Sequence, residues 1–298
     1  MPRFLSTGNA VVDIMVRPVD GLRWGETALV ESLRQSVGGN GANTAYALAR
    51  LGNPVRLIAS VGRDALGDFV VDYLRSGGVD TGGVRRSDAP TGATVGLVRS
   101  DGGRTFLHSL GASAGVLVSP EELARELPGC IHYHLAAPFR LTRMRPTMPD
   151  LLRTARAAGL TTSLDTQWDP EGRWLQDIGP CLPHTDYFFA NEDEFRMLTG
   201  TGDPAEAAGI LLRQGASTVV LKLEARGCAV YAGGAEIRCP ALDVPVVDTT
   251  GAGDCFVAGF LHRAVRGAGL REAAEFANSI AARAIQSLGA TEALRMAL

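Results

Sequence analysis

The segment 248–256, Asp-Thr-Thr-Gly-Ala-Gly-Asp-Cys-Phe, places an aspartate beside two glycines at the start of an apolar stretch. Gly251 and Gly253 allow the chain to turn tightly into a helix. The free N–H groups at that helix start attract a phosphate or a developing negative charge. Because Asp254 would repel a phosphate, we interpret it as a general base for a hydroxyl that attacks phosphorus. A helix N-cap is the alternative.

A second glycine-rich stretch, residues 38–45, is followed by Ala-Leu-Ala-Arg-Leu-Gly at 47–52. Together with segment 248–256 it resembles the two signatures of the ribokinase-like sugar kinases, also called the phosphofructokinase-B family. The two signatures occur in the family's order, and the resemblance extends along essentially the whole chain. It implies ATP-dependent phosphorylation of a hydroxymethyl group on a sugar or sugar-like acceptor, with ATP and Mg²⁺ as cofactors.

The resemblance also implies roles for the residues around the predicted base. Asp254 would take the proton of the attacking hydroxyl. The backbone N–H groups of Ala252, Gly253 and Asp254 would stabilise the charge on the transferred group. The predicted catalytic residues are therefore Asp254, Gly251, Ala252 and Gly253.

Polar residues follow the first predicted strand, at the end where ligands bind in open α/β sheets. Their side chains offer donors and acceptors for sugar hydroxyls, although an ordinary Asn/Asp turn is the alternative. By resemblance, Asp13 and the loop 38–43 grip the acceptor, with close backbone approach at the glycines. The predicted acceptor residues are Asn9, Asp13, Gly38, Gly39, Asn40 and Asn43.

Asn191 and Glu194 follow another predicted strand and resemble the family's N-x-x-E motif, which helps to hold magnesium and its waters. Three residues apart at a helix start, both side chains face one point. Mg²⁺ prefers oxygen ligands and usually keeps several waters. A capped helix with an acidic first turn is the alternative.

The only lysine of the chain, Lys222, is followed by leucine, which excludes a Walker A loop. It begins the stretch 222–227, where relatives place a glycine-containing turn that touches the nucleotide phosphates. Glu224 replaces the first glycine of that turn. Asn278 is the candidate near the adenine, with an ordinary polar helix position as the alternative. The predicted nucleotide contacts are Lys222, Gly227, Asn278 and Asn191.

Other polar and aromatic residues are weaker candidates. Asp248 and Thr250, with carbonyls near 287–290, correspond to the loop that binds potassium in several relatives. Asp165 would approach the phosphate or metal region and Trp168 would border the ligand, unless they form a capped loop with a packed indole. Phe139, His108 and Arg140 are candidates for the lid or the acceptor pocket. His132 and His134 share one face of a strand, as a pair of zinc ligands would need.

The composition narrows the functional class. The 298 residues are 46% hydrophobic, with net charge −3 and pI about 6.0, so no basic surface predicts nucleic-acid binding. There is neither signal-peptide architecture nor an apolar run long enough for a membrane span. Five scattered cysteines, none in C-x-x-C spacing, favour a reduced, cytoplasmic protein.

Short apolar runs alternate with helical patterns, which predicts one α/β domain over 1–298 with a mostly parallel sheet covered on both faces. This is the three-layer sandwich that the resemblance implies. Two regions, 13–36 and 91–110, have strand-like segments without a crossover helix. By resemblance they form a small β-sheet lid, which would also join two copies into a homodimer. The predicted strands are 4–8, 55–60, 131–135, 161–164, 187–190 and 218–221, and the predicted helices are 43–51, 66–76, 146–158, 192–198, 204–213, 252–265 and 270–287.

Two other functions are compatible with the same residues. A nucleoside kinase would use the same base, with Trp168 and Phe139 available to stack on a nucleobase. A catalytically silent ligand sensor would be expected to lack Asp254 or the glycines beside it, and all are present. A Rossmann dehydrogenase is disfavoured, because no G-x-G-x-x-G opens a helix after a strand.

Overall fold

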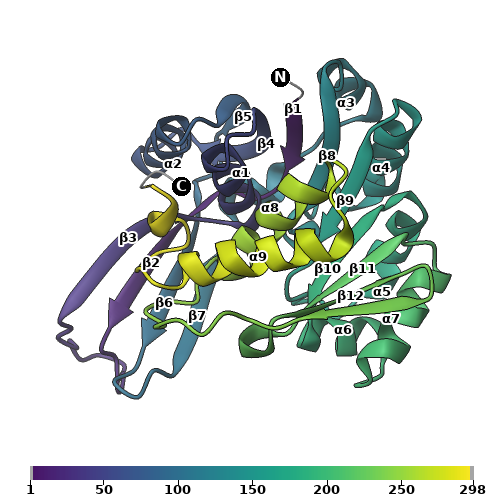
Figure 1. The fold of residues 1–298 in the computed structure, drawn as a ribbon. Helices are drawn as coiled ribbons and strands as arrows, with labels where there is room; N and C mark the ends of the chain where they lie inside the picture. The colour runs from purple at the N-terminus through teal and green to yellow at the C-terminus, as the bar shows by residue number, and fades with distance from the viewer. Residues whose placement is uncertain (1–2, 296–298) are drawn as a thin grey trace.

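The computed structural model describes residues 3–295, and within them the strands form two sheets (Figure 1). The larger consists of β1 (Arg3–Thr7), β4 (Val55–Gly62), β5 (Asp80–Ser87), β8 (Cys130–Ala136), β9 (Thr161–Asp165), β10 (Tyr187–Asn191), β11 (Thr218–Lys222), β12 (Cys228–Ala232) and β13 (Ala235–Cys239). Its order is β13-β12-β11-β10-β9-β8-β1-β4-β5. Only the β11–β12 and β12–β13 pairs are antiparallel. The predicted mostly parallel α/β sheet is confirmed.

Helices cover both faces of the large sheet (Figure 1). One layer contains α1 (Asn40–Arg50), α2 (Ala65–Ser76), α8 (Ala252–Ala264) and α9 (Leu270–Ala284), and the other α3 (Pro120–Glu126), α4 (Met148–Ala157), α5 (Leu175–Ile178), α6 (Glu192–Thr199) and α7 (Pro204–Arg213). Successive strand residues point to opposite faces, so Phe188 packs into one hydrophobic core and Phe189 into the other. No helix in residues 3–295 is both long and apolar enough to cross a bilayer.

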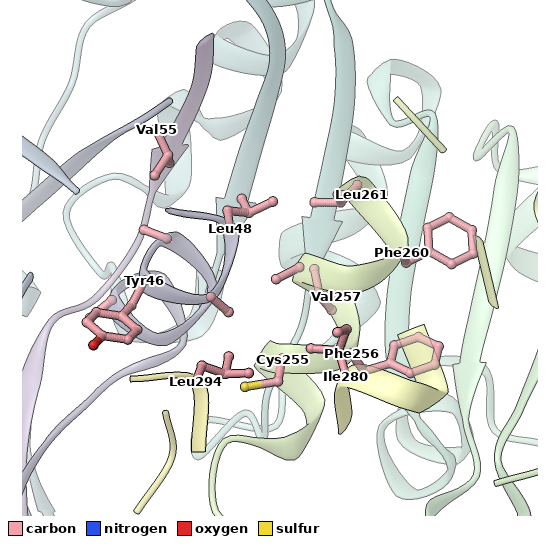
Figure 2. Packing of buried hydrophobic residues seen from close by; sticks show 14 of the residues in the cluster. Tyr46, Leu48, Val55, Cys255, Phe256, Val257, Phe260, Leu261, Ile280 and Leu294 are labelled. Carbon is pink, nitrogen blue, oxygen red and sulfur yellow. The ribbon is translucent and has the colours of Figure 1, made fainter. Parts of the chain in front are cut away.

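The core under α1, α8 and α9 positions the start of α8 (Figure 2). Val257, Phe260 and Ile280 are buried between the helices and the sheet. A Cβ at Gly259 would lie only 3.0 Å from the Cα of Ala277, so α8 and α9 approach closely at this glycine. This packing fixes the axis of α8, and with it the position of Asp254 in the first turn.

The second sheet, called the small sheet below, consists of β2 (Val11–Arg17), β3 (Ser32–Gly38), β6 (Gly92–Val98) and β7 (Arg104–Ser109). Its order is β3-β2-β6-β7, with β2 and β6 parallel and the other pairs antiparallel. In Figure 1 it extends away from the large sheet beside α9. Its strands come from the two segments, 13–36 and 91–110, that were predicted to form such a sheet.

Several predicted boundaries are wrong. The helix expected from residue 43 begins at Asn40, because Gly39 adopts φ 94° and turns the chain earlier. The helix expected to reach 287 ends at Ala284. Strands β12 and β13 were missed although Gly233 and Gly234, both with positive φ, form the turn between them. Strand β5 was missed because it has no continuous apolar run. Helices α3 and α5 were also missed.

Candidate active site

Asp254 lies in the first turn of α8 and is 5% exposed. Its Oδ1 accepts a hydrogen bond from Asn40 Nδ2 at 2.9 Å, and its Oδ2 accepts one from Asn43 Nδ2 at 2.8 Å. Burial raises the pKa of Asp254, whereas the Asn43 amide and the charge of Lys222 oppose that rise. The result is a carboxylate held in one orientation and more basic than a solvated aspartate, as a general base requires.

The starts of α1 and β2 meet through backbone contacts that only glycine permits. A Cβ at Gly39 would lie 2.7 Å from the carbonyl oxygen of Asn9, and one at Gly41 would lie 2.6 Å from the Cα of Gly8. The Asn9 side chain accepts from the N–H of Gly41. The predicted loop 38–43 is therefore partly wrong: its residues from Asn40 on form the first turn of α1.

Asp13 on β2 lies beside Gly38 on β3, and both were predicted to contact the acceptor. A Cβ at Gly38 would stand 2.0 Å from Asp13 Oδ2, so the glycine makes room for this carboxylate. Burial raises the pKa of Asp13 to about 6, a hydrogen bond from Thr94 opposes the rise, and the charges of Asp254 and Asp248 add to it. Gly38 is two residues before Asn40, whose amide holds Asp254, so Asp13 lies close to the predicted base.

The glycine-rich turn before α8 leaves backbone donors free. Gly251 has φ 72°, and a Cβ there would lie 2.4 Å from that of Ala290. The N–H of Ala252 donates to the Thr249 carbonyl, so one of the three predicted anion-binding amides is occupied. Within residues 3–295 the N–H groups of Gly253 and Asp254 have no backbone partner. These two amides remain available for a phosphate.

Lys222, whose side chain is 16% exposed, lies against the same turn. Its ammonium donates to Asp165 Oδ1 at 2.7 Å, and a Cβ at Gly253 would lie 3.5 Å from its Nζ. Burial alone would lower the pKa of Lys222, but the carboxylates of Asp165, Glu194 and Asp254 raise it above its usual value. Burial raises the pKa of Asp165 to about 7 against the opposing effect of Lys222. A fixed cation therefore stands beside the free amides.

Asn191 and Glu194 form a capping box at the start of α6. Asn191 Oδ1 accepts from the Glu194 N–H at 2.9 Å, and Glu194 Oε2 accepts from the Asn191 N–H and the Thr166 hydroxyl. Burial raises the pKa of Glu194. The alternative considered above, a capped helix, is therefore present, and it holds the carboxylate at the edge of the sheet where Lys222 ends β11.

The predicted cation loop is closed on itself. Asp248 Oδ1 accepts from the N–H and the hydroxyl of Thr250, and Oδ2 accepts from the N–H of Gly289. Arg104 of the small sheet reaches the same carboxylate at 3.3 Å. Asp248 and Thr250 thus lie together as predicted, and an arginine that sequence reasoning did not consider contributes positive charge to the loop.

The turn after β11 has Glu224 where the resemblance places a glycine. Glu224 adopts φ 53°, a left-handed conformation. A Cβ at Gly227 would lie 2.1 Å from the Cys239 carbonyl oxygen. Asn278 Nδ2 donates to the carbonyls of Cys239 and Pro240. Gly227 and Asn278 therefore both hold the chain that leaves β13, and their contact with a nucleotide stays a prediction.

Of the remaining candidate residues, some are buried in the core and others are exposed. Phe139 is buried in the core against Trp174, whereas Trp168 is 51% exposed. His108 contacts Thr94 on the small sheet, and burial together with Arg140 lowers its pKa to about 4. The Ser163 hydroxyl contacts one ring nitrogen each of His132 and His134.

Sequence reasoning missed two kinds of contact. It treated Asn40 as an acceptor ligand, whereas its amide holds Asp254. It also missed the arginines of the small sheet. Alternation along β2 was the available signal, because residues two apart on a strand share a face and Asp13, Met15 and Arg17 follow that spacing.

The chain is similar in sequence and fold to known kinases. The family model for the pfkB family carbohydrate kinases matches residues 6–296. The chain is 36% identical over 288 residues to the ATP-dependent ribose-1-phosphate kinase of Halopiger xanaduensis, covering 95% of this chain and 91% of that protein. It superposes on Arabidopsis thaliana ribokinase complexed with ribose and ATP with a TM-score of 0.85, at 27% identity and over 98% and 95% of the two chains. It superposes on the adenosine kinase of Sinorhizobium meliloti with a TM-score of 0.84, at 26% identity and over 96% of this chain and 94% of that protein. The chain belongs to the pfkB family of carbohydrate kinases, ATP-binding phosphotransferases with an alcohol acceptor.

Proposed function

We propose that this protein transfers the γ-phosphoryl group of ATP to a hydroxymethyl group of a sugar acceptor, with Asp254 as the general base. The acceptor oxygen bonds to the γ-phosphorus while its proton passes to Asp254. The bond from phosphorus to the bridging oxygen breaks, and its electron pair leaves with ADP. The observation that carries the proposal is the buried Asp254 carboxylate, held by two amides at the helix start.

Two features would stabilise the charge of the transferred group. The N–H groups of Gly253 and Asp254 are free of backbone partners in the described chain, and they point out of a helix start. The Lys222 ammonium lies beside Gly253 and is fixed by Asp165. Donors fixed in advance lose no free energy to reorganisation during the reaction, which makes them effective.

The residues near Lys222 fit a hydrated magnesium ion. Glu194 and Asn191 supply oxygen atoms, and Asp165 Oδ2 is buried without a hydrogen-bond partner in residues 3–295. Oxygen donors of this kind suit Mg²⁺, which keeps several of its waters. When bound, Mg²⁺ neutralises charge on the β- and γ-phosphates. In this proposal Asn191 and Glu194 hold it through those waters.

A sugar suits the acceptor side better than a nucleoside. Asp13 and the backbone at Gly38 and Gly39 offer polar groups, and the small sheet would act as a lid that excludes water. Phe139, one of the two rings considered for stacking on a nucleobase, is buried in the core.

The potassium site and the homodimer also belong to the proposal. Asp248 and Thr250 would bind K⁺ close to the anion-binding turn, so KCl should activate more than tetramethylammonium chloride does. The small sheet exposes Leu33 and Leu107 on the face opposite Asp13, which supports pairing between two copies. The five free cysteines support a reducing compartment such as the cytoplasm.

The test is ADP release with Mg-ATP over a panel of sugars, sugar phosphates, sugar acids and nucleosides. Asp254→Asn should lower kcat about 10²- to 10⁴-fold, the usual effect of losing a general base. Asp80→Asn makes the same chemical change at an exposed carboxylate on β5 and should leave kcat unchanged. Full turnover by Asp254→Asn would disprove the assignment of the base.

A further inference from the structure

Three arginines share one face of the small sheet, which we call the inner face because it carries Asp13. Side chains alternate along a strand, so Arg17 lies on the same face of β2 as Asp13. Register pairs Arg34 with Met15, which is two residues from Asp13. Arg104 pairs with Val98, four residues after Thr94, the partner of Asp13. All three arginines therefore project toward the acceptor side.

These arginines line a cavity of about 460 Å³ between the small sheet and the loops at 247–250 and 287–289. Asp13 also lines it, beside Gly38, which is two residues before the Asn40 amide that holds Asp254. Because a strand rises about 3.3 Å per residue, Arg34 stands about 7 Å beyond Asp13 along the sheet. A group on the opposite side of a sugar from the attacked hydroxymethyl would therefore reach the arginines.

The charges in this cavity do not cancel. Among its acidic residues, Asp248 is bound by Thr250, Gly289 and Arg104, and Glu292 pairs with Arg295 at 3.2 Å. In residues 3–295, Arg17 and Arg34 have no ion pair and no side-chain hydrogen bond. Two guanidinium groups are thus left for a ligand.

We infer that the acceptor is a sugar phosphate and that Arg17 and Arg34 bind its phosphate, with Arg104 shared between the phosphate and Asp248. The inference rests on the proposed function and names its substrate class. A phosphate monoester carries nearly two negative charges at neutral pH, which match the two unpaired arginines, whereas a sugar acid carries one. The planar fork of a guanidinium also suits two phosphate oxygens at once.

The experiment compares kcat/KM for ribose 1-phosphate and fructose 1-phosphate with that for ribose, fructose and 2-keto-3-deoxygluconate. A sugar phosphate should be preferred over its parent sugar. Arg34→Ala and Arg17→Ala should each lower kcat/KM for the phosphate about 10- to 100-fold, as expected for a hydrogen bond to a charged group. They should change kcat/KM for the parent sugar less than twofold, and Arg34→Lys should restore part of the loss.

Arg99→Ala is the matched control, since Arg99 directly follows β6, pairs with Asp101 and does not line the cavity. Equal use of unphosphorylated sugars, or a preference for the sugar acid, would overturn the inference and leave the kinase proposal intact. If no turnover is observed, calorimetric titration with the sugar phosphates tests the acceptor inference separately from the kinase proposal. Binding of a sugar phosphate that is lost in Arg34→Ala would support the phosphate site at these arginines even without turnover, and no binding overturns the inference.

Discussion

The two halves of the active site are held in opposite ways. Around Asp254 the polar side chains are buried or half-buried and bound to one another, as in the Asn40 and Asn43 contacts and the Lys222–Asp165 pair. On the small sheet Arg17 and Arg34 are exposed and unpaired within residues 3–295. The first half fixes a reaction geometry before any substrate arrives. In our proposal the second half leaves charge that a ligand would neutralise, so substitutions there should change the preferred acceptor at little cost to folding.

Apart from loss of the general base, removing the Lys222 cation should produce the largest loss that the comparison predicts. Lys222→Met should lower kcat about 10²- to 10³-fold, as the loss of a transition-state donor does. The pKa of Asp165, already about 7, should rise further without Lys222, so this carboxyl would be protonated at neutral pH. Steady-state kinetics with saturating ATP measures the loss.

The double variant Lys222→Met/Asp165→Asn separates two roles of the lysine. If Lys222 acts on the transferred phosphoryl group, the double variant should keep the low kcat of Lys222→Met. Recovery of kcat would mean that the lysine only balances the charge of Asp165 and does not act on the transferred phosphoryl group.

A methyl group at Gly251 should disturb the anion-binding turn. An alanine there would place its Cβ 2.4 Å from Ala290 Cβ at φ 72°, so the turn must shift. A displacement of about 1 Å is enough to reduce kcat about 10²-fold. Gly267→Ala is the control, because Gly267 has φ 87° but no atom within 4 Å of the added Cβ. Equal losses in the two variants, in kcat and in urea unfolding, would show that the close contact with Ala290 is irrelevant.

The local motifs brought Asp254, Asn43 and Asp13 into one predicted site, and the structure places the Asn43 amide against Asp254. The roles of these three residues stay predictions. The Lys222–Asp165 pair was not predicted. Its members lie 57 positions apart on β11 and β9, which are separated in the sheet by β10. Only the strand order brings the two side chains to one point, and that order is a property of the assembled fold.

The arginines of the small sheet show the same limit. Arg104 and Asp248 are 144 positions apart, and they meet because the small sheet folds over the loop before α8. The strands of that sheet were expected, but their pairing was not, and pairing decides which residues share the inner face. Position along the chain alone therefore could not distinguish Arg34 from the many exposed arginines.

Asp13 links the two halves and predicts a dependence on pH. Its pKa is about 6 in the folded protein, above the ordinary value of 3.8, so the folded state keeps a proton that the unfolded chain releases. Stability from this group is complete below pH about 4 and is lost as the pH rises through 6. Relative to Asp13→Asn, the protein should lose up to about 3 kcal/mol over that range, at 1.36 kcal/mol per pKa unit.

Urea unfolding of both proteins at pH 4, 5, 6 and 7 measures this difference. A difference that does not change with pH would mean that Asp13 keeps an ordinary pKa. It would then be too well solvated to lie beside Asp254 under a closed sheet.

The outer face of the small sheet should give the smallest effect on catalysis. Leu33 and Leu107 are 64% and 61% exposed there. Leu107→Asp should convert a dimer into monomers by analytical ultracentrifugation, because a charge would be buried in an apolar contact. Leu242→Asp, at a leucine 53% exposed outside the small sheet, should leave the dimer intact.

The effect of Leu107→Asp on turnover decides how independent the two faces are. If the inner face alone meets the acceptor, kcat/KM in the monomer should stay within about twofold of the wild type, since surface substitutions away from special features have small effects. A much larger loss would mean that the partner copy holds the small sheet closed over the site. In the dimer the small sheet would then be held in place by the partner copy, and the difference between the two halves of the site would apply only to the isolated chain. A wild type that sediments as a monomer would remove the dimer from the proposal and leave the inner-face arginines unaffected.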